Sequence, residues 1–114
     1  MKDRSATEFL SDARAYALEA HSLASGLSQA TFDADRRSQL AIFFCLAAVG
    51  EALNQVQKDI RTLAADIPWM AINGLRNRLV HGYWLIDTQI VLRIAQEDAT
   101  ALAAAIERLI EKIR

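Results

Sequence analysis

Residues that interrupt helices are rare in this sequence, and their rarity limits the fold more than any other feature does. The 114 residues include one proline and four glycines, whereas alanine, leucine, arginine, glutamate and glutamine are common. These common residues favour the helical conformation, and glycine and proline disfavour it. The sequence therefore predicts an all-α fold in which helices cover nearly the whole chain.

The composition predicts one folded domain spanning residues 1–114. Hydrophobic residues make up 53% of the chain and the formal net charge is −1, whereas a disordered chain combines low hydrophobicity with high net charge. The apolar run at residues 40–50 is much shorter than the roughly 20 apolar residues that span a bilayer. No apolar segment typical of a signal peptide follows the N-terminus. We therefore expect a cytoplasmic protein without a membrane partner.

Apolar periodicity and capping signals predict the helix boundaries. We expect helices at about residues 4–25, 34–58, 69–81 and 88–112. The polar connector at residues 28–33 ends in Asp33, which is suited to cap the second helix, and Asp87 is suited to cap the fourth. Pro68 favours a helix start directly after it, and Gly82 predicts a left-handed cap at the end of the third helix. The short connections predict an antiparallel, up-and-down bundle of four to five helices.

The middle of the second expected helix is apolar on every side. Residues 40–49 read LAIFFCLAAV, and a helix that is apolar all round must be covered on more than one side. We expect the bundle to cover one side and a second copy of the chain to cover another. The sequence therefore predicts a homodimer.

The cysteine and histidine content predicts no metal site. Cys45 is the only cysteine, so no intrachain disulfide can form, and its apolar surroundings indicate a buried thiol rather than a reactive one. The two histidines, His21 and His81, are sixty residues apart in the sequence. One chain therefore offers no recognisable zinc ligand set. We expect neither a metal nor a cofactor, and we assign His21 no role.

The residues with potential for chemistry gather between positions 73 and 84. Between Asp66 and Asp87 the sequence has no acidic residue, and Arg76 and Arg78 make this stretch locally cationic. It is the one segment that favours a phosphate. Because the chain as a whole is not basic, we expect no DNA partner, and an RNA contact must use this local patch.

The spacing within this segment predicts a small catalytic cluster. Asn77 and His81 are four residues apart and share a helical face, so the amide is placed to orient the imidazole. Arg76 is long enough to reach the same site from the previous turn, and Tyr83 follows Gly82, where a turn brings its hydroxyl nearby. An imidazole that transfers protons beside a guanidinium that binds phosphate is what cleavage of RNA by its own 2′-hydroxyl requires.

The same residues also have a purely structural explanation. Arginine and histidine in the last turn of a helix stabilise that end of the helix dipole. Tyr83 and Trp84 can act as apolar anchors. From spacing alone, both explanations stay open.

Three segments of the sequence resemble one known family. Residues 67–69 (Ile-Pro-Trp) followed by residues 72–83 (INGLRNRLVHGY) resemble the signature of the HEPN superfamily, specifically the HepT-like toxins that accompany a minimal nucleotidyltransferase. Residues 49–52 (Val-Gly-Glu-Ala) resemble the Gly-Glu-Ala element of that family, and residues 86–98 resemble the start of its last helix. The resemblance covers most of the chain from the second expected helix to the C-terminus.

This resemblance implies an all-α HEPN bundle with a metal-independent endoribonuclease site, often completed where two subunits face each other. It implies that Arg76 holds the scissile phosphate, that His81 acts as general base or acid, and that Asn77 supports one or the other. Tyr83 would line the site or carry a nucleotide added by a cognate nucleotidyltransferase antitoxin. The expected partners are therefore RNA, bound with the help of Arg78 and Tyr83, the antitoxin, and a second copy of the chain.

Other functions remain open beside the ribonuclease toxin. Some HEPN proteins are binding modules, so the chain can also be a non-catalytic partner or substrate-binding subunit of a minimal nucleotidyltransferase, or a purely structural helical dimer. The ribonuclease hypothesis predicts that His81→Ala abolishes toxicity, and the binding hypothesis predicts indifference to His81. The connection at residues 57–67 looks shorter and more apolar than the family pattern, which would alter the width of a groove without changing the motif.

Overall fold

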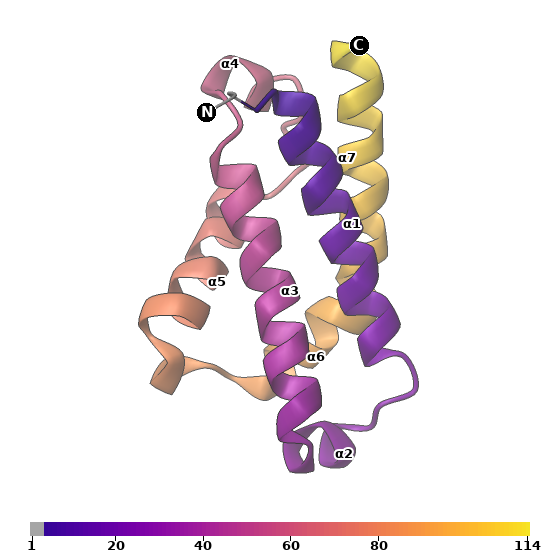
Figure 1. The fold of residues 1–114 in the computed structure, drawn as a ribbon, viewed down its shortest axis with the longest axis vertical. Helices are drawn as coiled ribbons and strands as arrows, with labels where there is room; N and C mark the ends of the chain where they lie inside the picture. The colour runs from indigo at the N-terminus through magenta and orange to yellow at the C-terminus, as the bar shows by residue number, and fades with distance from the viewer. Residues whose placement is uncertain (1–3) are drawn as a thin grey trace.

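Three long helices lie side by side, and a fourth packs on the outside of one of them (Figure 1). The computed structural model describes residues 4–114. α1 (Ala6–Ala24) packs against both α3 (Arg36–Asn54) and α7 (Ala99–Ile113), while α5 (Trp69–His81) packs against α3 on the side away from α1. The four helices alternate in direction along the chain (Figure 1). No strand occurs within residues 4–114, and the predicted all-α bundle is confirmed.

Four short elements connect these helices. They are α2 (Gln29–Ala34), α4 (Lys58–Arg61), the 3-10 turn η1 (Tyr83–Leu85) and α6 (Thr88–Arg93). A π-helical turn, η2 (Ile94–Asp98), joins α6 to α7.

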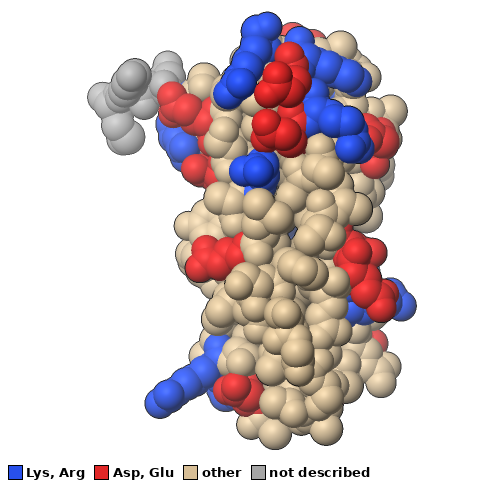
Figure 2. Space-filling view, turned by 90° about the vertical axis from the view of Figure 1, so that its right-hand side faces the viewer, with Lys and Arg blue, Asp and Glu red and all other residues tan. Residues whose placement is uncertain are grey.

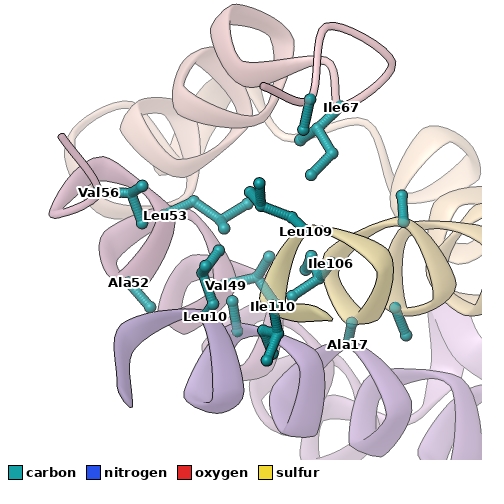
Figure 3. Close-up of a cluster of buried hydrophobic side chains, with 14 of the residues drawn as sticks. Leu10, Ala17, Val49, Ala52, Leu53, Val56, Ile67, Ile106, Leu109 and Ile110 are labelled. Carbon is teal, nitrogen blue, oxygen red and sulfur yellow. The ribbon is translucent and has the colours of Figure 1, made fainter. Parts of the chain in front are cut away.

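Alanines on α1 allow the three long helices to approach closely. Ala13, Ala17, Ala20 and Ala24 are fully buried, because their small side chains face α3 and α7. Ala13 and Ala17 lie in the cluster of Figure 3, together with larger side chains from α1, from the neighbouring helices and from the segments that connect them. These include Leu10, Val49, Leu53, Val56, Ile67, Ile106 and Leu109. A second cluster at the other end of the bundle surrounds Phe32 and Ile42.

The expected connector at residues 28–33 is instead a short helix, which the sequence analysis did not predict. The Ser28 hydroxyl accepts a hydrogen bond from the Thr31 amide, so α2 begins with its own cap. The burial of Phe32 explains why the turn stays folded. Asp35 rather than Asp33 caps α3, accepting from the Arg37 amide at 3.1 Å. Hydrogen bonds from Ser38 lower the pKa of the Asp35 carboxyl.

The second expected helix also ends earlier than residue 58. α3 stops at Asn54 because Arg61 folds back over its end, where its guanidinium donates to the Asn54 and Val56 carbonyl oxygens at 3.0 and 2.8 Å. Val56 itself is buried. These tertiary contacts compensate for the helix hydrogen bonds that are lost.

The structure also corrects the predicted left-handed cap at Gly82. Its φ is −132°, and within the described residues the positive φ of 79° belongs to Gly26, after α1. The Gly82 amide still donates to the Arg78 carbonyl at 3.1 Å, and the chain then enters η1. Asp87 caps the following helix as predicted, accepting from the Gln89 amide at 2.9 Å.

The last expected helix contains the π-helical turn that no sequence signal indicated. Two side chains tie this turn to the end of α1. Gln96 donates to the carbonyl oxygens of Ala24 and Leu27 at 2.9 and 2.7 Å, and the His21 ring lies 3.1 Å from the Ala95 carbonyl oxygen. The π-helical turn lacks the regular hydrogen bonds of an α-helix, and the hydrogen bonds to the end of α1 compensate for this loss.

The distribution of charge does not form a continuous basic surface on the face drawn in Figure 2. Lysine and arginine alternate there with aspartate and glutamate, mostly at the upper end, and uncharged residues cover most of the rest. Among residues 4–114, no helix has the length and apolarity needed to cross a bilayer.

Candidate active site

The sequence-predicted motif lies on α5, which is held only from one side. Ile72, Leu75 and Leu79 recur at steps of three and four residues and pack against the core as half-buried side chains. No residue of α5 is fully buried. The helix therefore presents most of its circumference, including the predicted site residues, to the surroundings.

A glycine allows α5 to cross α3 at close range. A Cβ atom added to Gly50 would lie 2.5 Å from Cβ and 2.9 Å from Cγ of Arg76. Only a residue without a side chain permits this approach. The stem of Arg76 consequently lies across α3, and its side chain is 23% exposed.

The Arg76 guanidinium holds together residues from two helices. Nη2 forms an ion pair with Oε2 of Glu51 at 2.8 Å. Nη1 donates to Oδ1 of Asn77 at 3.1 Å and lies 3.4 Å from Nε2 of His81. Nε is buried and has no hydrogen-bond partner. All the polar side-chain contacts of this cation therefore come from the edge that carries Nη1 and Nη2.

The contact with Arg76 favours one tautomer of the neutral His81 ring. A guanidinium can only donate, so in that neutral form Nε2 of His81 accepts and the ring proton is on Nδ1. His81 is the last residue of α5 and is exposed. The arrangement thus places an imidazole beside a cation, at a position open to a substrate.

Asn77 reaches this cluster by a different contact from the predicted one. Its amide oxygen accepts from Arg76, and within residues 4–114 no hydrogen bond joins Asn77 to His81. Asn77 therefore contacts the guanidinium and not the imidazole.

Arg78 and Tyr83 lie outside the cluster in this chain. Arg78 follows Arg76 by two residues, which on an α-helix is a rotation of about 200°, and it is exposed. Tyr83 is 71% exposed and packs edge-on against Trp84 with ring centroids 5.4 Å apart. The structure brings Arg76, Asn77 and His81 together and leaves Arg78 and Tyr83 at the margin.

An apolar groove, here called the α3–α5 groove, runs beside the cluster. Its volume is about 550 Å³ and its lining includes Leu40, Phe44, Val80 and Tyr83. All four of these side chains are exposed, Phe44 by 63%. Apolar side chains gathered in this way are typical of a surface that another molecule covers.

Comparison with known proteins assigns the family. A family model described as ribonuclease HepT-like matches residues 5–109. The chain belongs to the HepT-like ribonuclease family. This membership confirms the resemblance inferred from the motif, and it confirms the predicted class of enzyme, a ribonuclease, at the level of the family.

Individual HepT-like relatives give the same picture. A protein of Thermococcus cleftensis named "Probable ribonuclease HepT" is 30% identical over 78 residues, which cover 68% of this chain and 71% of the relative. Two proteins of Methanocaldococcus jannaschii, each named "Putative RNase", are 26% identical over 113 residues, covering 99% of this chain and 97% and 93% of theirs. No solved structure gave a significant match.

Two residues of this HepT-like site were not assigned roles from the sequence. Gly50 and Glu51 lie in the segment that resembles the Gly-Glu-Ala element, yet they are about 25 positions away from Arg76 in the sequence. Neither periodicity nor spacing connects residues on different helices. The steric contact of Gly50 and the ion pair of Glu51 become apparent only once α5 is packed on α3.

Proposed function

We propose that this chain is the toxin of a toxin–antitoxin pair and cleaves RNA by a metal-independent endonucleolytic reaction at Arg76 and His81. The observation that carries the proposal is the 3.4 Å approach of Arg76 Nη1 to His81 Nε2. It combines an imidazole nitrogen, which can take a proton once it leaves this contact, with a cation able to hold a phosphate. The ribonuclease family supports the same chemistry.

The reaction we propose uses the ribose hydroxyl of the RNA as nucleophile. Nε2 of His81 takes the proton of the 2′-hydroxyl, the 2′-oxygen bonds to phosphorus, and the bond from phosphorus to the 5′-oxygen breaks. As charge grows on the phosphate oxygens, the Nη1 and Nη2 edge of Arg76 donates to them. Nη1 thereby gives up its contact with the His81 imidazole and donates to a phosphate oxygen instead. The products carry a 2′,3′-cyclic phosphate and a 5′-hydroxyl.

The leaving 5′-oxygen needs a proton from a second group, and this requirement favours a homodimer. A single imidazole that has just accepted a proton cannot act as an independent acid in the same step. We propose that a second copy packs against the α3–α5 groove, where Phe44 and Leu40 are exposed, and brings its own His81 to the same phosphate. A twofold dimer uses the same surface on both copies.

Tyr83 is the proposed point of control by a nucleotidyltransferase antitoxin. In the single chain its side chain is 71% exposed and it follows His81 by two residues, so another enzyme can reach its hydroxyl before a second copy covers the α3–α5 groove. A nucleotide attached there adds negative charge and bulk beside the cluster and repels an RNA phosphate. A role of Tyr83 and Arg78 in binding RNA belongs to the same proposal.

The test is RNA cleavage by the purified protein in the presence of a chelator, beside His81→Ala prepared in the same way. We expect the wild type to cut and the variant to be inactive, with products whose 5′-hydroxyl ends accept a phosphate from polynucleotide kinase. Circular dichroism and mass in solution verify that the variant keeps its helices and its assembly. A wild type that leaves transfer, messenger and ribosomal RNA intact contradicts the nuclease and favours a non-catalytic partner of the nucleotidyltransferase.

A further inference from the structure

Glu51 is the one acidic side chain in contact with the Arg76 guanidinium, among the described residues, and it comes from a different helix. Its Oε2 lies 2.8 Å from Nη2 of Arg76. Its other oxygen, Oε1, accepts from the side-chain amide Nε2 of Gln55, one turn later, at 3.4 Å. Glu51 is therefore held on α3 while it binds a residue of α5.

Because the guanidinium is rigid, its contact with Glu51 also affects how it meets His81. The group is planar, so a contact that holds Nη2 also restricts where Nη1 can lie. Nη1 is the atom that meets Asn77 and His81. Nε has no partner in the structure, so no other side-chain hydrogen bond restrains the plane of the group from the α3 side.

The environment of the pair argues against a role in stability alone. The side chain of Glu51 is 52% exposed, and ion pairs that water reaches contribute little to folding. A carboxylate beside a phosphate-binding cation also repels the phosphate, so its presence lowers affinity for RNA. The environment of Glu51 therefore favours a role in the rate of the reaction over a role in stability or in substrate binding.

We propose that Glu51 is a positioning residue for the ribonuclease reaction: it holds Arg76 so that Nη1 lies at His81 before the reaction and reaches the scissile phosphate during it. This inference rests on the proposed function. It implies that Glu51 raises kcat, because the chemical step depends on the geometry of Arg76. It also implies that the charge of Glu51 weakens RNA binding. Gly50 supports the same arrangement, because it allows the stem of Arg76 to lie next to Glu51.

The experiment measures kcat and KM for a labelled RNA in chelator, for the wild type, Glu51→Gln, Glu51→Asp, His81→Ala and a control. We expect Glu51→Gln to lower kcat by about 10- to 100-fold, since small displacements of a catalytic group have effects of this size. KM should stay unchanged or fall, because the repulsive charge is gone. Glu51→Asp, which keeps the charge on a shorter side chain, should recover part of kcat.

The matched control is Glu107→Gln. It makes the same chemical change on a glutamate of similar exposure, 46% against 52%, in the ion pair of Glu107 with Arg14 at 3.1 Å, far from the motif in sequence and on other helices. Its kcat should equal that of the wild type. Thermal melts of Glu51→Gln and Glu107→Gln show whether a lower kcat comes from the reaction itself or from loss of folded protein.

The outcomes separate the two proposals. If the wild type cuts RNA, His81→Ala does not, and Glu51→Gln keeps the wild-type kcat, the positioning role is wrong and the nuclease stands. A rise of KM alone in Glu51→Gln also overturns it. If the wild type itself does not cut, the proposed function fails and the positioning role falls with it.

Discussion

Gly50 and Arg76 touch so closely that a single methyl group at Gly50 would overlap the Arg76 side chain, at 2.5 Å from its Cβ. The contact joins the backbone of α3 to the stem of the proposed phosphate-binding residue. The neighbour of Gly50, Glu51, then pairs with the guanidinium at the end of that stem. The packing of α5 on α3 therefore also determines where the Arg76 guanidinium lies.

Replacing Gly50 by alanine should therefore damage both stability and activity. The added Cβ forces α5 away from α3 at a cost of about 1–3 kcal/mol, as for other overpacked sites, and RNA cleavage should fall with it. The matched control is Gly74→Ala on α5, where nothing lies within 4 Å of an added Cβ. That change should stabilise the protein by about 0.5–1 kcal/mol. Chemical denaturation measures both values, and equal effects of the two variants would contradict the steric argument.

Arg76 and Arg78 should differ sharply although they are two residues apart. Arg76→Ala removes the cation that contacts Asn77 and His81, so we expect kcat to fall by about 100- to 1,000-fold. Arg78→Ala should leave kcat unchanged and raise KM in a salt-dependent way, because Arg78 lies outside the cluster and can only attract the RNA backbone. Steady-state kinetics at two salt concentrations distinguish them. A loss of kcat in Arg78→Ala would place it in the site.

A charge in the α3–α5 groove should separate the proposed dimer. Phe44→Glu puts a carboxylate on an exposed apolar side chain that lines the groove. We expect the mass from light scattering to fall from that of two chains to that of one, and RNA cleavage to be lost with it. Leu23→Glu, on an exposed residue of α1 away from the groove, should remain dimeric. A Phe44→Glu protein that stays dimeric would mean that the copies meet elsewhere.

Cys45 should be inert to alkylating reagents while the protein is folded. Burial raises the pKa of its thiol to about 11, so at pH 8 only about one thiol in a thousand is the reactive thiolate. We expect no labelling by iodoacetamide in native buffer and complete labelling in guanidinium chloride, read by mass spectrometry. Rapid labelling of the native protein would show that this part of α3 opens readily.

Asp35 should stabilise the fold only while its carboxyl is ionised. Hydrogen bonds from Ser38 and the Arg37 amide lower its pKa below the ordinary value of 3.8. A lowered folded-state pKa favours folding at pH values above the unfolded-state pKa, and this advantage disappears as the pH falls through the folded-state pKa. Asp35→Ala should melt at a lower temperature than the wild type at pH 7, and the difference should shrink below about pH 4. A constant difference would exclude the carboxylate as its cause.

Local rules of the sequence determined much of this protein. The scarcity of glycine and proline gave an all-α chain, and Pro68 and Asp87 marked the starts of α5 and the last helical region because a fixed φ and a side-chain cap act within one turn. The segment around Arg76 and His81 was recognisable for the same reason, since Asn77 and His81, four apart on one helix, are neighbours whatever surrounds them and the Arg76 side chain is long enough to reach them.

Contacts between distant segments were decided by tertiary structure alone. The burial of Phe32 turned an expected connector into α2, Arg61 ended α3, and Gln96 made a π-helical turn favourable by binding the end of α1. Glu51 contacts Arg76 because α5 packs on α3, and no local rule of the sequence predicts that packing. Helix propensity and capping act over a few residues, whereas the partner of a charged group depends on which helices the whole core brings together.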